Sequence, residues 1–133
     1  IEAGAAGVQL ATRFICTQEC DASLEFKNQF IKCKNKDDII VIDSPVGLPL
    51  RIIKNKFIEE VLEGKHSPKS CIYKCLRTCD FQKVTFCIIK ALINSVQGRP
   101  DDGIICSSVN GYRNDRIVSV RELINTIERE YSE

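Results

Sequence analysis

The chain has 133 residues, of which 44% are hydrophobic and 28% are charged, and its formal net charge is +1 at pH 7. This balance is ordinary for a soluble globular protein, and so small a charge gives no field that would attract nucleic acid or an anionic membrane. No apolar run approaches the roughly 20 residues that a membrane span requires. We therefore expect a small molecule as the partner, while the oligomeric state stays open, a homodimer included.

The chain contains eight cysteines, a high number for its length. A secreted disulfide scaffold is one interpretation, but such scaffolds are rich in loops, whereas this sequence has long helical patterns. We favour a reducing cytoplasm, in which several thiols serve as small core side chains. Because Met is absent and a strand-like stretch follows almost at once, we expect Ile1 to be an internal position of a longer protein.

The first predicted elements are a strand and a helix. Residues 6–10 are small or apolar and indicate a short buried strand, and residues 11–14 follow as a turn. From 17 to 34 the apolar residues recur with helical spacing, with charged residues on the opposite side. The expected buried face of this helix consists of Leu24, Phe26, Phe30, Ile31 and Cys33.

Two strands and a capped helix are predicted next. The β-branched run at residues 39–42 indicates a buried strand, and residues 50–53 indicate a second one. Between them, residues 44–49 contain two prolines and a glycine, which interrupt any strand ladder. Asn55 is a good N-terminal cap for a helix that runs to Leu62.

The second half of the chain is predicted to be mainly helical. Residues 71–79 indicate a short helix and residues 84–96 a stronger one, followed by a short apolar segment at 104–106. Ser119 and Glu122 have the spacing of a capping box, which opens a final amphipathic helix. The inward residues of that helix are expected to be Val120, Leu123, Ile124 and Ile127.

The strand and turn at residues 4–14 carry the most specific signal. Small residues around a strand allow backbone amides to approach a bound group closely. A strand that ends in a small residue and Thr12, with a helix beyond, can offer amide N–H groups and a hydroxyl to phosphate oxygens. On this pattern alone, a buried strand with a tight turn is the commoner explanation. We expect Arg13 to fix a loop by hydrogen bonds.

The stretch GAAGVQLATRF at residues 4–14 resembles the last barrel strand of the nitronate monooxygenase (2-nitropropane dioxygenase-like) family, which also includes flavin-dependent enoyl-acyl-carrier-protein reductases. Further similarity extends to residues 119–123. The resemblance implies an α/β fold: the C-terminal part of a (β/α)8 TIM barrel, with its last strand, plus a mainly helical cap. It divides the chain into residues 1–36 (strand, phosphate turn and helix), 37–118 (cap and substrate region) and 119–133 (C-terminal helix).

The resemblance also implies a cofactor and a reaction. Residues Gln9, Leu10, Ala11 and Thr12 match the family's stretch that holds the FMN phosphate, with Ala11 where the family has Gly. The intact protein would oxidise alkyl nitronates with dioxygen, or, as a second possibility, would be an FMN- and NAD(P)H-dependent enoyl-acyl-carrier-protein reductase. The family's catalytic His lies upstream, so we expect no catalytic residue and no activity in this segment alone. We interpret His66 as a surface residue.

A cluster of four cysteines is the second signal, and it allows two interpretations. On a helix, Cys71, Cys75 and Cys79 form one stripe, and Cys87 can return from the next helix to complete a set for zinc or an iron–sulfur cluster. An unbroken helix, however, separates successive members by about 6 Å. We therefore favour a thiol-lined packing seam. A different class of function follows from this cluster, namely a non-catalytic thiol-rich module that binds metal or a partner.

Overall fold

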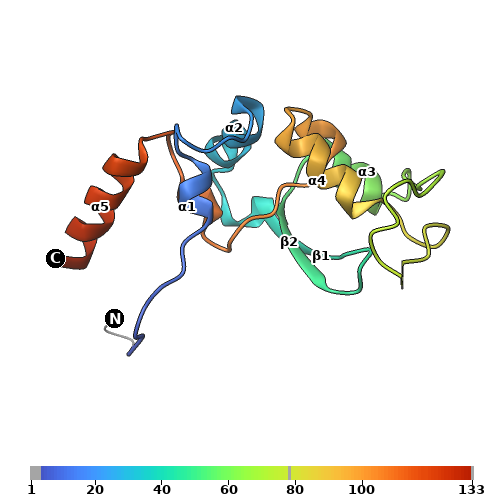
Figure 1. The fold of residues 1–133 in the computed structure, drawn as a ribbon, viewed down its shortest axis with the longest axis horizontal. Coiled ribbons are helices and arrows are strands. Elements are labelled where there is room, and N and C mark those ends of the chain that lie inside the picture. The colour runs from blue at the N-terminus through green and yellow to red at the C-terminus, as the bar shows by residue number, and fades with distance from the viewer. Residues whose placement is uncertain (1–3, 78, 133) are drawn as a thin grey trace.

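The computed structural model describes residues 4–77 and 79–132, which form a small sheet with helices packed around it (Figure 1). Within these ranges, no helix is both long and apolar enough to cross a membrane. The helices and strands in chain order are α1 (Thr12–Ile15), α2 (Leu24–Lys32), β1 (Ile39–Asp43), β2 (Pro49–Ile53), α3 (Lys56–Leu62), α4 (Ile88–Val96) and α5 (Val120–Ser132).

The two predicted strands form an antiparallel pair, in which Ile39 lies opposite Ile53. A third extended segment, residues 104–107, lies along the other edge of β2. The Ile53 N–H donates to the Ile105 carbonyl at 2.9 Å, and the Ser107 N–H donates to the Arg51 carbonyl at 3.1 Å. The apolar segment predicted at 104–106 is therefore part of the sheet, where it covers the edge that β2 would otherwise expose.

The sheet separates two hydrophobic cores. Neighbouring residues of a strand point to opposite faces of a sheet, and Ile52 and Ile104 accordingly face one core while Ile53 and Ile105 face the other. These four side chains are at most 3% exposed. The first core, beside α3 and α4, contains Ile42, Ile52, Phe57, Ile58, Val61, Phe86, Ala91 and Ile104; the second, beside α2, contains Cys16, Phe26, Phe30, Cys33, Ile53 and Ile105.

The helix predicted from residue 17 begins only at Leu24. Ser23 caps it, since its Oγ accepts the Phe26 N–H at 3.2 Å. Residues 17–22, before the cap, are not helical because Thr17 forms a parallel bridge with Val118 and the Gln18 N–H donates to the Val118 carbonyl at 2.8 Å. A partner far along the chain thus overrides the local helical pattern. Of the expected buried face, Phe26, Phe30 and Cys33 are confirmed, Ile31 is half-buried, and Leu24 is 59% exposed.

The buried strand predicted at residues 6–10 is not formed. These residues form no helix or strand and are exposed, with Val8 73% and Leu10 38% exposed. In Figure 1 this stretch runs away from the body of the molecule toward the N-terminus. A strand needs a neighbour for its backbone N–H and C=O groups, and no described residue supplies one. The predicted barrel strand therefore has no barrel here.

Helix α3 begins where its cap was predicted. The Asn55 Oδ1 accepts the Ile58 N–H at 3.0 Å, and the same amide donates to the carbonyls of Pro100 and Gly103 at 2.7 and 2.9 Å. One side chain thus caps α3 and ties it to the segment that enters the sheet at residue 104. The helix ends at Leu62, as predicted.

The helix predicted at 71–79 is absent from the described residues, which form turns and irregular backbone. Helix α4 begins at Ile88 rather than at residue 84, because Phe86 is drawn into the first core at 3% exposure, and Cys87 then serves as the N-cap. The left-handed backbone of Lys74, with φ of 45°, is incompatible with a continuous helix through this segment.

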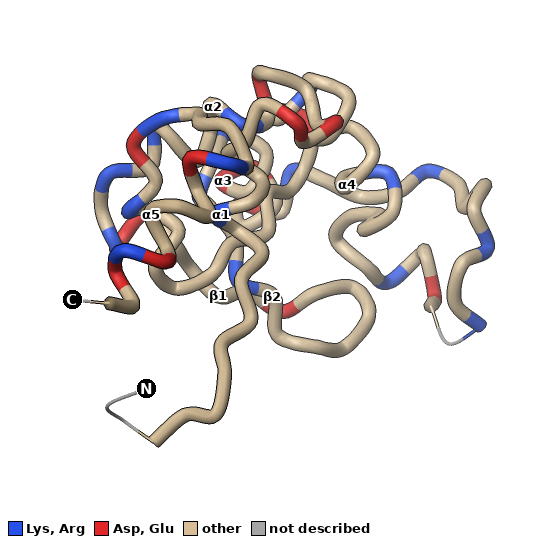
Figure 2. The backbone as a smooth tube through the Cα atoms, turned by 60° about the vertical axis from the view of Figure 1, so that its left-hand side comes forward, with Lys and Arg blue, Asp and Glu red and all other residues tan. Residues whose placement is uncertain are grey.

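Helix α5 begins after Ser119, whose Oγ accepts the Glu122 N–H at 3.1 Å, as the capping box predicts. The Glu122 carboxylate contacts Arg116 at 2.8 Å instead of completing the box. Helix α5 also leaves the body of the molecule and lies beside α1 (Figures 1 and 2). Its predicted inner face is therefore only partly covered: Leu123 is 4% exposed, Val120 and Ile127 are half-buried, and Ile124 is 43% exposed.

Candidate functional site

The predicted phosphate turn lies at the start of α1. Ala11 precedes the helix, and its carbonyl accepts the N–H groups of Phe14 and Ile15 at 2.9 and 3.2 Å. Its φ is −130°, outside the left-handed region that favours glycine. Alanine therefore fits this turn without backbone strain, although the family pattern has Gly there.

Hydrogen-bond donors gather at this turn. The first N–H groups of a helix have no acceptor within it, so the amides of Thr12 and Arg13 are available to an anion. The Thr12 Oγ1 accepts the Ser108 N–H at 3.3 Å, which leaves the hydroxyl proton free to donate. Gln9 and Leu10 approach the turn on exposed backbone. The turn can thus offer two amides and one hydroxyl to phosphate oxygens.

Arg13 clamps α5 rather than facing the turn. Its guanidinium donates two hydrogen bonds to the Glu130 carboxylate, at 2.9 and 3.3 Å. These bonds hold the pKa of Glu130 below its ordinary value. At the other end of α5, the Glu19 carboxylate accepts the Val120 N–H at 2.9 and 3.1 Å. The α1 region therefore holds the C-terminal helix at both ends.

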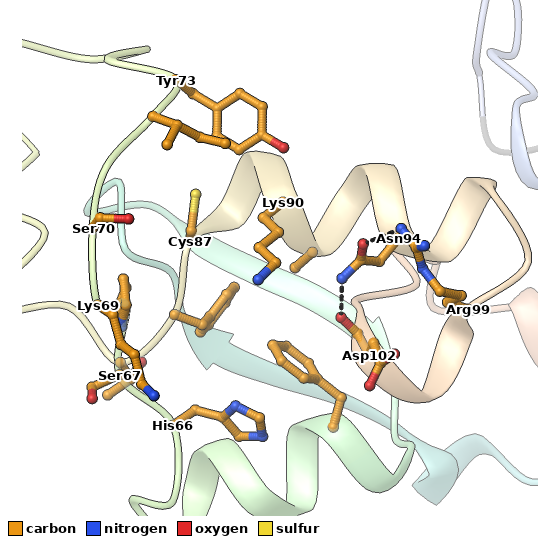
Figure 3. Close-up of a pocket in the computed structure, with 16 residues that line it drawn as sticks. His66, Ser67, Lys69, Ser70, Tyr73, Cys87, Lys90, Asn94, Arg99 and Asp102 are labelled. Atoms are coloured by element: carbon orange, nitrogen blue, oxygen red, sulfur yellow. Dashed lines mark hydrogen bonds between the residues drawn. The ribbon is translucent and has the colours of Figure 1, made fainter.

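A pocket of about 760 Å³ forms a second candidate site, between α3, α4 and the segment that follows α3 (Figure 3). The Asn94 side chain donates to the Asp102 carbonyl at 2.9 Å and accepts from Arg99 at 2.7 Å, which fixes one wall. Figure 3 shows Lys90 pointing from α4 into this space. Three cations, Lys69, Lys90 and Arg99, and one carboxylate, Asp102, line the pocket, an excess of positive charge suited to an anionic ligand.

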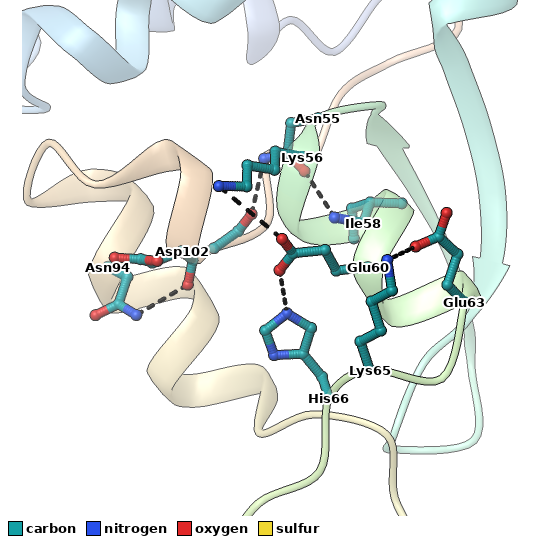
Figure 4. A network of polar contacts seen from close by, with 10 residues as sticks. Asn55, Lys56, Ile58, Glu60, Glu63, Lys65, His66, Asn94 and Asp102 are labelled. Carbon is teal, nitrogen blue, oxygen red and sulfur yellow. Dashed lines mark hydrogen bonds and ion pairs between the residues drawn. The ribbon is translucent and has the colours of Figure 1, made fainter.

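His66 borders this pocket, which the interpretation as a surface residue missed. Its Nε2 lies 2.8 Å from the Glu60 Oε2, its ring centroid lies 4.8 Å from that of Phe57, and its side chain is 33% exposed (Figure 4). The hydrogen bond from His66 lowers the pKa of Glu60. The glycine that follows α3 was the signal in the sequence for a turn before His66. In the structure, Gly64 has a φ of 74° and turns the chain back over α3.

The four clustered cysteines do not form a packing seam on a helix. Instead, all four border one small apolar pocket of about 20 Å³, beside Phe86. Their thiols are free, and Cys75 is exposed while the other three are half-buried. Burial, followed by the neighbouring Cys75, Cys71 and Cys87, raises the pKa of Cys79. As they stand, no three metal-ligating side chains of the described residues are arranged so that they could hold one ion.

Comparison with known proteins gives one family and a group of similar folds. The chain superposes on FabK from Thermotoga maritima with a TM-score of 0.74 and 21% identity, covering 98% of this chain and 38% of that one. A FabK mutant from the same organism gives a TM-score of 0.71 and 20% identity, with coverages of 98% and 36%. No curated protein matches.

The matched portion is a mixed α/β segment in which the described residues do not close a barrel. The chain spans less than two fifths of the length of these FabK structures. The profile of the nitronate monooxygenase family matches residues 1–130, nearly the whole sequence. The chain therefore belongs to the nitronate monooxygenase family.

Proposed function

We propose that this chain is part of an FMN-dependent oxidoreductase that oxidises alkyl nitronates with dioxygen, and that residues 9–12 hold part of the FMN phosphate. Family membership supports the class of enzyme. The observation that carries the phosphate site is the turn before α1, where Ala11 adopts a negative φ and the Thr12 hydroxyl belongs to the first residue of the helix, whose initial N–H groups have no acceptor within it. When bound, FMN supplies the electron-transfer chemistry.

The chain's own residues would bind the phosphate of the cofactor and orient the substrate. The turn at Ala11 and Thr12 would fix the phosphate end of the cofactor, as helix N-termini do for anions in general. The pocket beside α4 would receive the substrate, because a nitronate is an anion and Lys90 and Arg99 face it. His66 would add a polar group whose orientation Glu60 fixes.

Purified full-length protein tests this proposal. We expect a yellow protein with about one FMN per chain and oxygen uptake that depends on an alkyl nitronate. Changing Thr12→Val should weaken FMN binding about fivefold, because one hydrogen bond contributes about 1 kcal/mol. Thr12→Ser is the matched control, since it keeps the hydroxyl for both the Ser108 N–H and the phosphate. A colourless protein that takes up no FMN would contradict the proposal and favour a non-catalytic thiol-rich module.

A second candidate is an FMN- and NAD(P)H-dependent enoyl-acyl-carrier-protein reductase, which the shared fold with FabK favours. The same preparation separates the two reactions. Oxidation of NAD(P)H that requires an enoyl thioester, without oxygen uptake on nitronates, would replace the first candidate by the second. For residues 1–133 alone we expect negligible turnover in either assay, because no described residue completes a barrel around the cofactor.

A further inference from the structure

Residues 66–87 differ from every other part of the described chain in being long and almost without regular structure. Connections longer than about 12–15 residues with no helix or strand of their own are uncommon in compact domains and are usually functional or disordered. This segment also leaves apolar side chains outside, with Ile72 76% and Leu76 43% exposed. Among its described side chains only Phe86, at the end of the segment, is fully buried in a core, so burial orders the rest of the segment weakly.

The feature that its turns do bring together is the set of four thiols. The left-handed residue Lys74 reverses the chain between Cys71 and Cys75, and Cys87 returns to the same place at the start of α4. All four cysteines border one pocket whose other walls are apolar, from the β1–β2 loop and the segment itself. The helix that would have set Cys71 and Cys79 about 12 Å apart is absent, so this helical separation does not apply here.

The number and grouping of the thiols indicate which ligand fits. Soft thiolate sets select zinc or iron–sulfur clusters among metal centres. Zinc sites are commonly built from two pairs of ligands, and thiolates about 2.3 Å from one ion must lie within about 4 Å of one another. Here three cysteines follow one another at four-residue intervals and a fourth comes eight residues later, and iron–sulfur proteins likewise draw ligands from a run of cysteines followed by a further one. All four thiols border the same small space.

The charge around the pocket fits the same ligand. Residues 66–87 contain four cations, Lys69, Lys74, Arg77 and Lys83, and one acid, Asp80, which gives a net charge of +3. Four thiolates on a cluster leave negative charge at the site, which nearby cations stabilise.

We propose that Cys71, Cys75, Cys79 and Cys87 bind an iron–sulfur cluster that orders residues 66–87. The cluster lies at the opposite end of the molecule from α1 (Figure 1), so it does not contact the phosphate turn. It borders the pocket beside α4, because Ser70 and Cys87 line both spaces. Order in this segment therefore sets one wall of the larger pocket.

Iron and acid-labile sulfide in full-length protein, purified without oxygen, test the proposal. We expect roughly equal amounts of iron and sulfide, as a cluster with four cysteine ligands requires, and a paramagnetic signal after reduction. Single Ser variants of Cys71, Cys75, Cys79 and Cys87 should each lose most of both. Cys20→Ser is the matched control, because Cys20 is half-buried outside this pocket, and it should keep them.

Two outcomes would overturn the proposal. One is the absence of iron and sulfide both from the anaerobic protein and after chemical reconstitution, and the other is stoichiometric zinc in their place. If a variant fails to fold, the iron and sulfide content of the unchanged protein still shows whether a cluster is bound. FMN content is measured separately, so failure of the cluster and failure of the proposed flavin function are distinguishable.

Discussion

The sheet with its two cores and the cysteine segment at residues 66–87 use the same kinds of side chain in opposite ways. In the body of the molecule, Cys16 and Cys33 are at most 3% exposed and pack beside Phe30 in the second core. In the segment, the cysteines border a pocket, and the described residues of the segment form no helix or strand that would support it. Cysteine therefore has no single structural meaning in this chain, because the hydrogen-bonded frame around it decides whether it packs or presents its thiol.

The largest expected contrast between the two regions is in thiol reactivity. Burial, with the nearby Cys20, raises the pKa of Cys16 to about 11 from 9.0, against an opposing effect of Lys27. Because the thiolate is the reactive form, the rise in pKa from 9.0 to about 11 should slow the reaction of Cys16 at pH 8 about 100-fold. Metal-stripped protein treated with iodoacetamide should therefore be labelled first at exposed Cys75, as peptide mass spectrometry would record. Equal rates at the two sites would mean that the second core opens readily.

Truncation of isoleucine should separate the regions in stability. Ile52 is fully buried beneath α3 and α4, and Ile52→Ala should lower the free energy of unfolding by about 2–5 kcal/mol, through lost burial and the cavity that remains. Ile72 is 76% exposed, so Ile72→Ala should change the free energy of unfolding by less than about 0.5 kcal/mol. Urea unfolding followed by circular dichroism measures both. A comparable loss for Ile72→Ala would show that the segment takes part in the cooperative fold.

Glycine substitutions give a smaller contrast, between the body and the exposed N-terminal stretch. A Cβ atom at Gly103 would lie 2.2 Å from the Ala91 carbonyl oxygen and 2.4 Å from the Ser95 Oγ, so the tightly packed start of the third sheet segment must shift. Gly103→Ala should therefore destabilise by about 1–3 kcal/mol. Gly7 has no atom within 4 Å of such a Cβ, and Gly7→Ala should leave the unfolding midpoint of this chain unchanged. A neutral Gly103→Ala would contradict the close packing of α4 on this segment.

The same contrast explains which elements the sequence could predict. Strands β1 and β2 and the cap at Asn55 depend on local pattern, and the sequence predicted all three. The start of α2 and the structure of residues 6–10 depend on pairing with distant segments. Val118 pairs with Thr17, before α2, and no described strand pairs with residues 6–10. Periodicity alone contains no information about either partner.

The candidate sites divide in the same way. The phosphate turn is a prediction from small residues and a threonine next to each other in sequence, and the structure adds the negative φ of Ala11. The pocket beside α4 was missed because it combines His66, Lys90 and Arg99 from separate elements. The cysteine set was found, but its geometry was assigned to a helix, since helical spacing of the thiols cannot reveal the left-handed turn at Lys74.

The smallest expected effect concerns the contact between α1 and α5. The pKa of Glu130 is lowered from 4.5 by its hydrogen bond to Arg13, so this contact contributes fully above pH 4.5 and is lost as pH falls through the folded-state value. Arg13→Gln should return the pKa of Glu130 toward 4.5 and speed amide exchange in the last turns of α5 already at neutral pH. The first turn should stay protected, because Glu19 and Ser119 still accept its N–H groups.

Carboxyl chemical shifts and pH-corrected hydrogen exchange measure the two parts of this prediction separately. An unchanged Glu130 titration in Arg13→Gln would mean that the ion pair does not hold α5. Loss of protection along the entire helix would mean instead that the Arg13 clamp, and not the cap at Ser119, keeps α5 folded. Because α5 packs on little besides α1, its order should follow that of the phosphate turn, so that FMN bound at Thr12 would slow exchange in α5 while leaving residues 66–87 unaffected.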